Sequence, residues 1–124
     1  MTVWAIIRFQ FEGFHRWKDA PKNQPYDIYF LRNLHRHMFH IEVWIEQKHN
    51  ERDIEYLTFK DWLLNLAIDT CELCPSLPLK FGITEEDSCE TMGTKIKAFI
   101  KNSYPDRKIR VFVFEDGENG TCVE

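Results

Sequence analysis

The stretch LHRHMFHIEVWIEQ, residues 34–47, carries three histidines at the start of an alternation between apolar and polar residues. A period of two over this length is typical of a β-strand with one buried face. The same phase extends backwards to His37 and His35, whereas His40 falls on the opposite face. The alternation therefore predicts that His35 and His37 point toward the core. The apolar residues of that face are Phe39, Ile41, Val43 and Ile45.

Three further segments predict strands. Residues 2–12 alternate in the same way, and residues 108–115 alternate again. EDGENG, residues 115–120, is typical of a hairpin turn, and it precedes a short strand at residues 121–123. The apolar face of the first segment consists of Val3, Ala5, Ile7, Phe9 and Phe11, and that of the second of Ile109, Val111 and Val113.

Two segments have apolar residues at helical spacing and predict helices. The first spans residues 59–68 and follows Thr58, which with Asp61 resembles a capping box. The second follows a similar pair, Thr84 with Asp87, and ends near Ser103.

The resulting order is ββααββ, which indicates an α+β fold in a single domain spanning residues 1–124. The simplest packing is a four-stranded antiparallel sheet with both helices on one face. Residues 13–33 and 69–83 contain prolines and glycines and predict loops. The first of these loops has a length typical of functional segments.

The overall composition excludes some classes of protein. The formal net charge of −4 and the absence of a basic block argue against a nucleic-acid binder. The apolar runs are too short to span a bilayer, and the N-terminus lacks the pattern of a signal peptide, so we expect a cytoplasmic protein. The four cysteines are then expected to be thiols: Cys71, Cys74, Cys89 and Cys122.

The apolar rows of the strands end in residues that can bind a metal or accept hydrogen bonds. The row of residues 2–12 continues in phase through Gly13 to His15, and the row of residues 108–115 ends at Glu115. If the first two strands are antiparallel neighbours, His15 lies near His35 and His37. Three neutral imidazoles with one open position form a catalytic type of zinc site. The alternative is that they are hydrogen-bonded residues at the edge of the core.

Four motifs resemble those of the 6-pyruvoyl-tetrahydropterin synthase and 6-carboxy-tetrahydropterin synthase family, which has the tunnelling fold (T-fold). FEGFH, residues 11–15, is similar to the family's F-x-A-x-H, and LHRH, residues 34–37, to its L-H-G-H. DSCE, residues 87–90, is similar to P-T-S-E, and VFVFED, residues 111–116, to V-x-V-x-E-T. The motifs cover most of the chain in the family's order and share its ββααββ plan.

The resemblance implies a zinc-dependent carbon–oxygen lyase that acts on a pterin similar to dihydroneopterin triphosphate, a chemistry that includes queuosine precursor biosynthesis. It implies that Glu115 accepts hydrogen bonds from the pterin ring. It also implies a homo-oligomer, a trimer or a hexamer, with pockets between subunits. The implied zinc ligands are His15, His35 and His37, and the implied pocket residues are Ser88, Cys89 and Glu90.

The sequence departs from the family at the residues that move protons. The family's catalytic cysteine lies four residues before the first histidine of its L-H-G-H motif, and Leu31 occupies that position here. The family's Asp-His pair between the helices is reduced to Asp69 followed by Thr70, and no histidine follows His49. Threonine cannot replace imidazole as a base near neutral pH.

The candidates for a replacement base are Asp69, Cys71, Cys74 and a zinc-bound hydroxide. Cys71 and Cys74 form a C-x-x-C pair, which can bind zinc or act in redox chemistry. Because there is no second pair, the favoured interpretation is two loop thiols without a shared task.

Three functions remain open from the sequence. The first is the zinc-dependent lyase. The second is a non-catalytic T-fold module that binds a pterin, a purine or a guanine nucleotide, which the missing cysteine and histidine favour. The third is a small α+β interaction protein with incidental histidines.

Overall fold

The computed structural model describes residues 1–22, 28–65 and 80–124. In these ranges no helix has the length and apolar character needed to cross a membrane. The predicted ββααββ order and α+β class are confirmed. The elements are β1 (Val3–His15), the 3-10 turn η1 (Tyr29–Arg32), β2 (His35–Gln47), α1 (Tyr56–Asn65), the 3-10 turn η2 (Lys80–Gly82), α2 (Cys89–Ser103), β3 (Ile109–Glu115) and β4 (Asn119–Val123).

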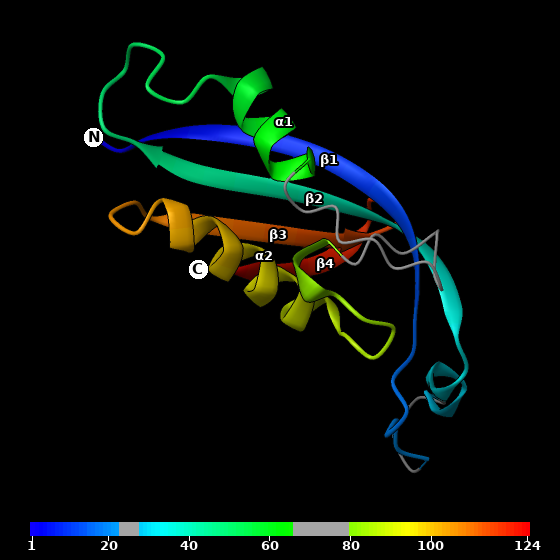
Figure 1. Cartoon of the computed structure of the whole chain (residues 1–124). Helices are drawn as coiled ribbons and strands as arrows, with labels where there is room; N and C mark the ends of the chain where they lie inside the picture. The colour runs from blue at the N-terminus through cyan, green and yellow to red at the C-terminus, as the bar shows by residue number, and fades with distance from the viewer. Residues whose placement is uncertain (23–27, 66–79) are drawn as a thin grey trace.

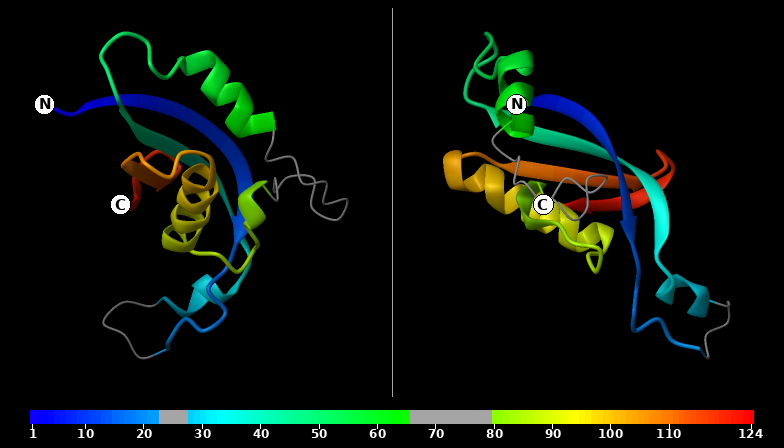
Figure 2. Two further views of the ribbon diagram at one scale, coloured as in Figure 1. Left: turned by 60° about the vertical axis from the view of Figure 1, so that its left-hand side comes forward. Right: turned by 45° about the vertical axis from the view of Figure 1, so that its right-hand side comes forward.

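The four strands form one antiparallel sheet in the order β1-β2-β3-β4 (Figure 1). β1 and β2 pair over thirteen residues each, from Val3 opposite Gln47 to His15 opposite His35. β3 is shorter and pairs with the middle of β2, so that Glu115 lies opposite Phe39. The far ends of β1 and β2 therefore extend beyond β3 (Figures 1 and 2).

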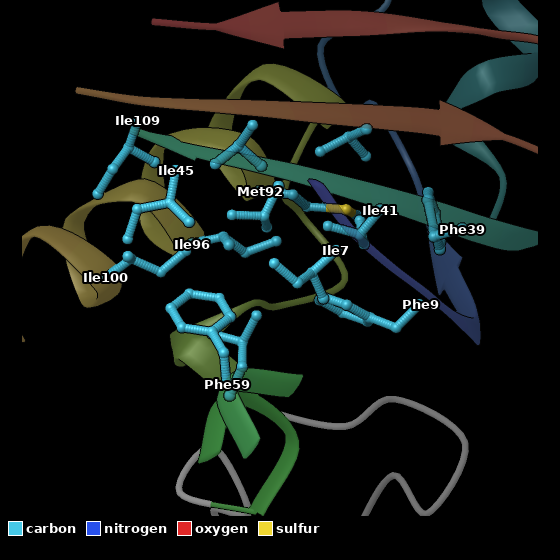
Figure 3. Packing of buried hydrophobic residues seen from close by; sticks show 14 of the residues in the cluster. Ile7, Phe9, Phe39, Ile41, Ile45, Phe59, Met92, Ile96, Ile100 and Ile109 are labelled. Atoms are coloured by element: carbon cyan, nitrogen blue, oxygen red, sulfur yellow. The ribbon is translucent and has the colours of Figure 1, made fainter. Parts of the chain in front are cut away.

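Both helices cover the same face of the sheet. α1 contacts β1, and α2 contacts β3 and β4 (Figure 2). Figure 3 shows Phe59 of α1 and Ile96 of α2 pointing into one core with residues of the sheet. Of the alternating strand residues expected on the core face, Val3 and Phe11 are only half-buried. The others are buried there: Ala5, Ile7, Phe9, Phe39, Ile41, Val43, Ile45, Ile109, Val111 and Val113.

The predicted element boundaries were partly wrong. β1 continues to His15, so the loop predicted at residues 13–33 begins after His15, three residues later than predicted. α1 begins at Tyr56, because the Glu55 carboxylate accepts a hydrogen bond from the Thr58 amide at 2.6 Å. Thr58 is thus inside the first turn and is not its cap. The end of the predicted first helix, residues 66–68, lies outside the described residues.

The second helix also begins later than predicted. Ser88 is its N-cap, and its hydroxyl oxygen accepts a hydrogen bond from the Thr91 amide at 3.1 Å. The predicted pair of Thr84 and Asp87 belongs to the preceding turn, where the Asp87 carboxylate accepts from the Thr84 amide at 2.9 Å. The same carboxylate is held by Lys95 of α2 at 2.6 Å, which fixes the turn against the helix.

Truncation of the core is expected to destabilise the fold strongly. Ile96 has no exposed surface and packs between the helices and the sheet. Ile96→Ala should lower the free energy of unfolding by about 2–5 kcal/mol, because it removes buried methylene groups and leaves a cavity. Ile6→Ala is the matched control, since Ile6 is 41% exposed on the opposite face of the sheet. Urea denaturation should show a clearly smaller loss for Ile6→Ala, and equal losses would contradict the assigned core.

Asp53 makes the stability of the fold depend on pH. Its carboxylate forms two contacts with the Arg107 guanidinium and accepts a hydrogen bond from the Lys48 amide at 2.6 Å. These interactions lower the pKa of Asp53 to about 2, with the hydrogen bond from Arg107 as the largest cause. Because the folded pKa lies below the unfolded one, the contribution to stability is complete above pH 4 and is lost as the pH falls toward 2.

Asp53→Asn should therefore lower the free energy of unfolding at pH 7, and the difference from the wild type should shrink between pH 4 and pH 2. Urea denaturation at a series of pH values measures this difference. Asp61→Asn is the control, because Asp61 is exposed on α1. A difference from wild type that stays constant down to pH 2 would contradict the role of the Asp53 carboxylate.

Candidate metal centre

The register of β1 and β2 brings three histidines together at the end of the sheet. His15 lies directly opposite His35, and Gly13 lies opposite His37. One ring nitrogen of each histidine lies within 4.8 Å of those of the other two, so the triad could hold a metal ion. The ring centroids are 4.6 to 5.2 Å apart. His15 is the most buried of the three, with 7% of its surface exposed.

Each of the three imidazoles is held through its Nδ1 atom. His15 Nδ1 donates to the Asp87 carbonyl at 3.1 Å, and His35 Nδ1 donates to the Asn33 carbonyl at 2.9 Å. His37 Nδ1 donates to the Asp116 carboxylate at 2.7 Å. Since carbonyl and carboxylate oxygens only accept, these bonds put the proton on Nδ1 and leave the Nε2 lone pair available. Histidines that bind metals are oriented in this way by outer partners.

Burial and charge support this protonation pattern. Burial lowers the pKa of His15 below its ordinary value, which favours the neutral imidazole that a metal requires. Hydrogen bonds from His37 and from the Met38 amide lower the pKa of Asp116, so this group stays a carboxylate. Asp116 has a positive φ of 56° in the β3–β4 turn, and its backbone N–H also donates to the Met38 carbonyl at 2.7 Å. The turn thus clamps Asp116 onto β2.

Glu115 lies against the triad. One carboxylate oxygen is 3.3 Å from His15 Nε2, and the other is 3.5 Å from His37 Nε2. The Cys89 thiol donates to Glu115 at 3.5 Å. Burial, followed by the charge of Glu115, raises the pKa of Cys89 to about 12, which favours the thiol over the thiolate near neutral pH.

A cavity of about 580 Å³ adjoins the triad, which is a size that accommodates a small-molecule ligand. Its charged lining is mainly acidic, and Arg16, the one arginine or lysine among the described residues that line it, is paired with Glu86 at 2.7 Å. Trp17 is 49% exposed and supplies an aromatic surface. The lining consists of His15, Arg16, Trp17, Leu31, His35, Glu86, Asp87, Ser88, Cys89, Glu90, Glu115, Asn119 and Gly120.

Backbone hydrogen bonds beyond the end of β1 fix the mouth of this cavity. The Arg16 N–H donates to the Glu85 carbonyl at 2.9 Å, which ties the chain to the turn before α2. The Trp17 N–H donates to the Leu31 carbonyl at 2.8 Å, which ties it to η1. Trp17 and Leu31 therefore form one wall, and Glu86 and Asp87 belong to another.

The residues expected from the sequence are distributed as follows. Ser88, Cys89, Glu90 and Glu115 all line the cavity with His15 and His35. Ser88 uses its hydroxyl to cap α2, so it contributes mainly to the position of the helix. His40 lies on the opposite face of β2, as expected, and is near Gly117. The three residues among the candidate bases lie outside the described residues: Asp69, Cys71 and Cys74.

Sequence reasoning missed the partners of the histidines and the aromatic wall. The Asn33 and Asp87 partners are backbone carbonyls, which have no signal in the sequence. Asp116 is in a turn and out of phase with the core row, so strand periodicity could not identify it. Trp17 continues the phase of His15 at the next alternate position, and this spacing could have indicated it.

Searches with models of known protein families and among curated proteins find no match to this chain.

Removal of the Asp116 carboxylate should weaken metal binding while the fold remains intact. Asp116→Asn keeps the size of the side chain but replaces an anionic acceptor with an amide, so the His37 ring is held less firmly. Loss of such an outer partner typically reduces metal affinity by about 10–100-fold. Competition titration with a chromophoric chelator measures the zinc affinity. Asp106→Asn, at an exposed position between α2 and β3, should bind zinc like the wild type. Equal affinity for Asp116→Asn and wild type would contradict this role.

Proposed function

We propose that this chain is a divergent T-fold protein that holds a zinc ion on His15, His35 and His37 and binds a flat, amino-substituted heterocycle of the pterin or purine type beside it. The observation that carries the proposal is the convergence of the three histidines, whose ligand nitrogens lie within 4.8 Å of one another. All three Nδ1 atoms face outer acceptors, and a cavity large enough for a ring system adjoins the triad.

Zinc fits this set of donors. Neutral imidazole nitrogens on three protein ligands are typical of zinc sites that remain accessible to a further ligand. Burial lowers the pKa of His15, which favours its neutral form, and Asp116 adds a negative charge behind His37. A zinc ion bound there would supply a Lewis acid next to the cavity.

The charge of the cavity narrows the class of ligand. Glu86, Glu90 and Glu115 present carboxylates, and Arg16 is already paired. Such a lining favours ring amino and N–H groups, which are donors, and disfavours a chain of phosphates. Trp17 offers a face on which a flat ring can stack. We therefore expect the ligand to be a pterin or purine base without a polyphosphate.

A lyase is the second candidate, and the position of the triad beside a cavity favours it. The chain's described residues do not supply the expected base. Leu31 is on the cavity wall where the resemblance implies a cysteine, and Cys89 remains protonated. A protein base would have to come from the segment containing Asp69, Cys71 and Cys74, or from a neighbouring subunit of the homo-oligomer that the resemblance implies.

Metal analysis followed by ligand titration tests the proposal. We expect about one zinc per chain, and binding of unphosphorylated neopterin or guanosine by the zinc-loaded protein. Trp17→Ala should weaken ring binding by about 10-fold or more, since stacking on an aromatic side chain contributes about 1–3 kcal/mol. Trp17→Phe is the matched control and should retain most of the affinity. Isothermal titration calorimetry measures all three proteins.

The results separate the candidates. Consumption of dihydroneopterin triphosphate by the zinc-loaded protein would establish the lyase and contradict the binding module. A protein that takes up no zinc, or one that takes up zinc but binds neither ring compound, would contradict the proposed function.

A further inference from the structure

The contacts of Glu115 differ from those of a carboxylate that is free to bind a ligand in the cavity. Both of its oxygens face histidine nitrogens, at 3.3 Å from His15 Nε2 and 3.5 Å from His37 Nε2. These are the two nitrogens that the outer hydrogen bonds leave without a proton. The third neighbour of Glu115, the Cys89 thiol, donates to it from the side of α2.

This arrangement places two kinds of hydrogen-bond acceptor in contact, the Glu115 carboxylate oxygens and the Nε2 atoms of two histidines. The Nε2 lone pairs of His15 and His37 face a negatively charged carboxylate at contact distance, and repulsion between them needs a positive charge in between. A proton can satisfy one of the two pairs, but a divalent cation satisfies both and also His35. Buried or partly buried charges are generally paired or bound to metals for this reason.

The distances agree with shared coordination. In a tetrahedral zinc site, bonds of about 2.0–2.2 Å separate neighbouring ligand atoms by about 3.3–3.6 Å. The contact of one Glu115 oxygen with His15 and that of the other oxygen with His37 both fall in this range. The ligand nitrogens of the three histidines lie within 4.8 Å of one another.

We propose that Glu115 is the fourth ligand of the metal, so that the resting site is closed by three histidines and one glutamate. This inference rests on the proposed metal site and deepens it. A heterocycle that approaches the metal must displace the carboxylate, and the displaced carboxylate is then available to the amino and N–H groups of the ring. The same residue thus closes the site before the ligand binds and accepts its hydrogen bonds afterwards.

Cobalt(II) substitution tests the fourth ligand directly, because the visible absorption of Co²⁺ reports the number and exchange of its ligands. The wild-type spectrum should not change when thiocyanate is added, since no coordination position is open. Glu115→Ala should bind Co²⁺ at least about 10-fold more weakly, and its spectrum should change on addition of thiocyanate. Glu118→Gln is the matched control, because it removes a carboxylate from the same turn but faces solvent. It should have the affinity and the spectrum of the wild type.

Three results would overturn the proposal. They are a thiocyanate-sensitive spectrum in the wild type, a spectrum of Glu115→Ala that does not respond to thiocyanate, and equal Co²⁺ affinities of Glu115→Ala and the wild type. If the three histidines do not form a metal site at all, the wild type and His35→Ala will both fail to bind Co²⁺. This result differs from the three results above, in which the wild type does bind Co²⁺. Circular dichroism of each variant confirms that the fold is retained.

Discussion

The site depends on the antiparallel pairing of β1 with β2 over thirteen residues each. This pairing places His15 opposite His35 at the end of the ladder, and the same ladder carries the buried rows that form the core. A shift of one residue would move the histidines and the apolar rows to the opposite face together. The free energy that fixes the core register therefore also fixes the geometry of the triad, at the end of the sheet beside the N-terminus of α2.

The outer partners connect this ladder to the rest of the chain. His15 is held by the turn before α2, His35 by the end of the loop before β2, and His37 by the β3–β4 turn. Lys95 of α2 in turn holds the Asp87 side chain. Because the Asp87 carbonyl accepts a hydrogen bond from His15, the position of α2 also affects the position of His15. The triad is thus preorganised by three separate segments, which is what a site needs when its ligands come from two strands only.

Much of the fold could be predicted from the sequence, and the reasons are local. A long alternation such as that of residues 34–47 predicts both a strand and its buried face. Extending the buried face to the end of each strand then identifies the candidate site residues His15, His35, His37 and Glu115. Helix starts were less predictable, because Thr58, Thr84 and Ser88 all resemble caps and only the packing selects among them. The contacts of Glu115 with two histidines depend on strand pairing and on the position of α2, so the spacing of residues in the sequence cannot predict them.

The chemistry of the cavity follows from what surrounds its thiol and its metal-binding nitrogens. Cys89 is beside the triad, but burial and the charge of Glu115 keep it protonated, whereas a nucleophilic cysteine requires a positive environment. Leu31 gives the opposite wall an apolar surface. The negative charges that prevent thiolate formation are the same ones that favour a cation at the triad and donor groups on a ligand. These surroundings agree with the proposed function, in which the triad holds a metal and the carboxylates accept hydrogen bonds from a ring, and they give Cys89 no positive charge that would make it a base.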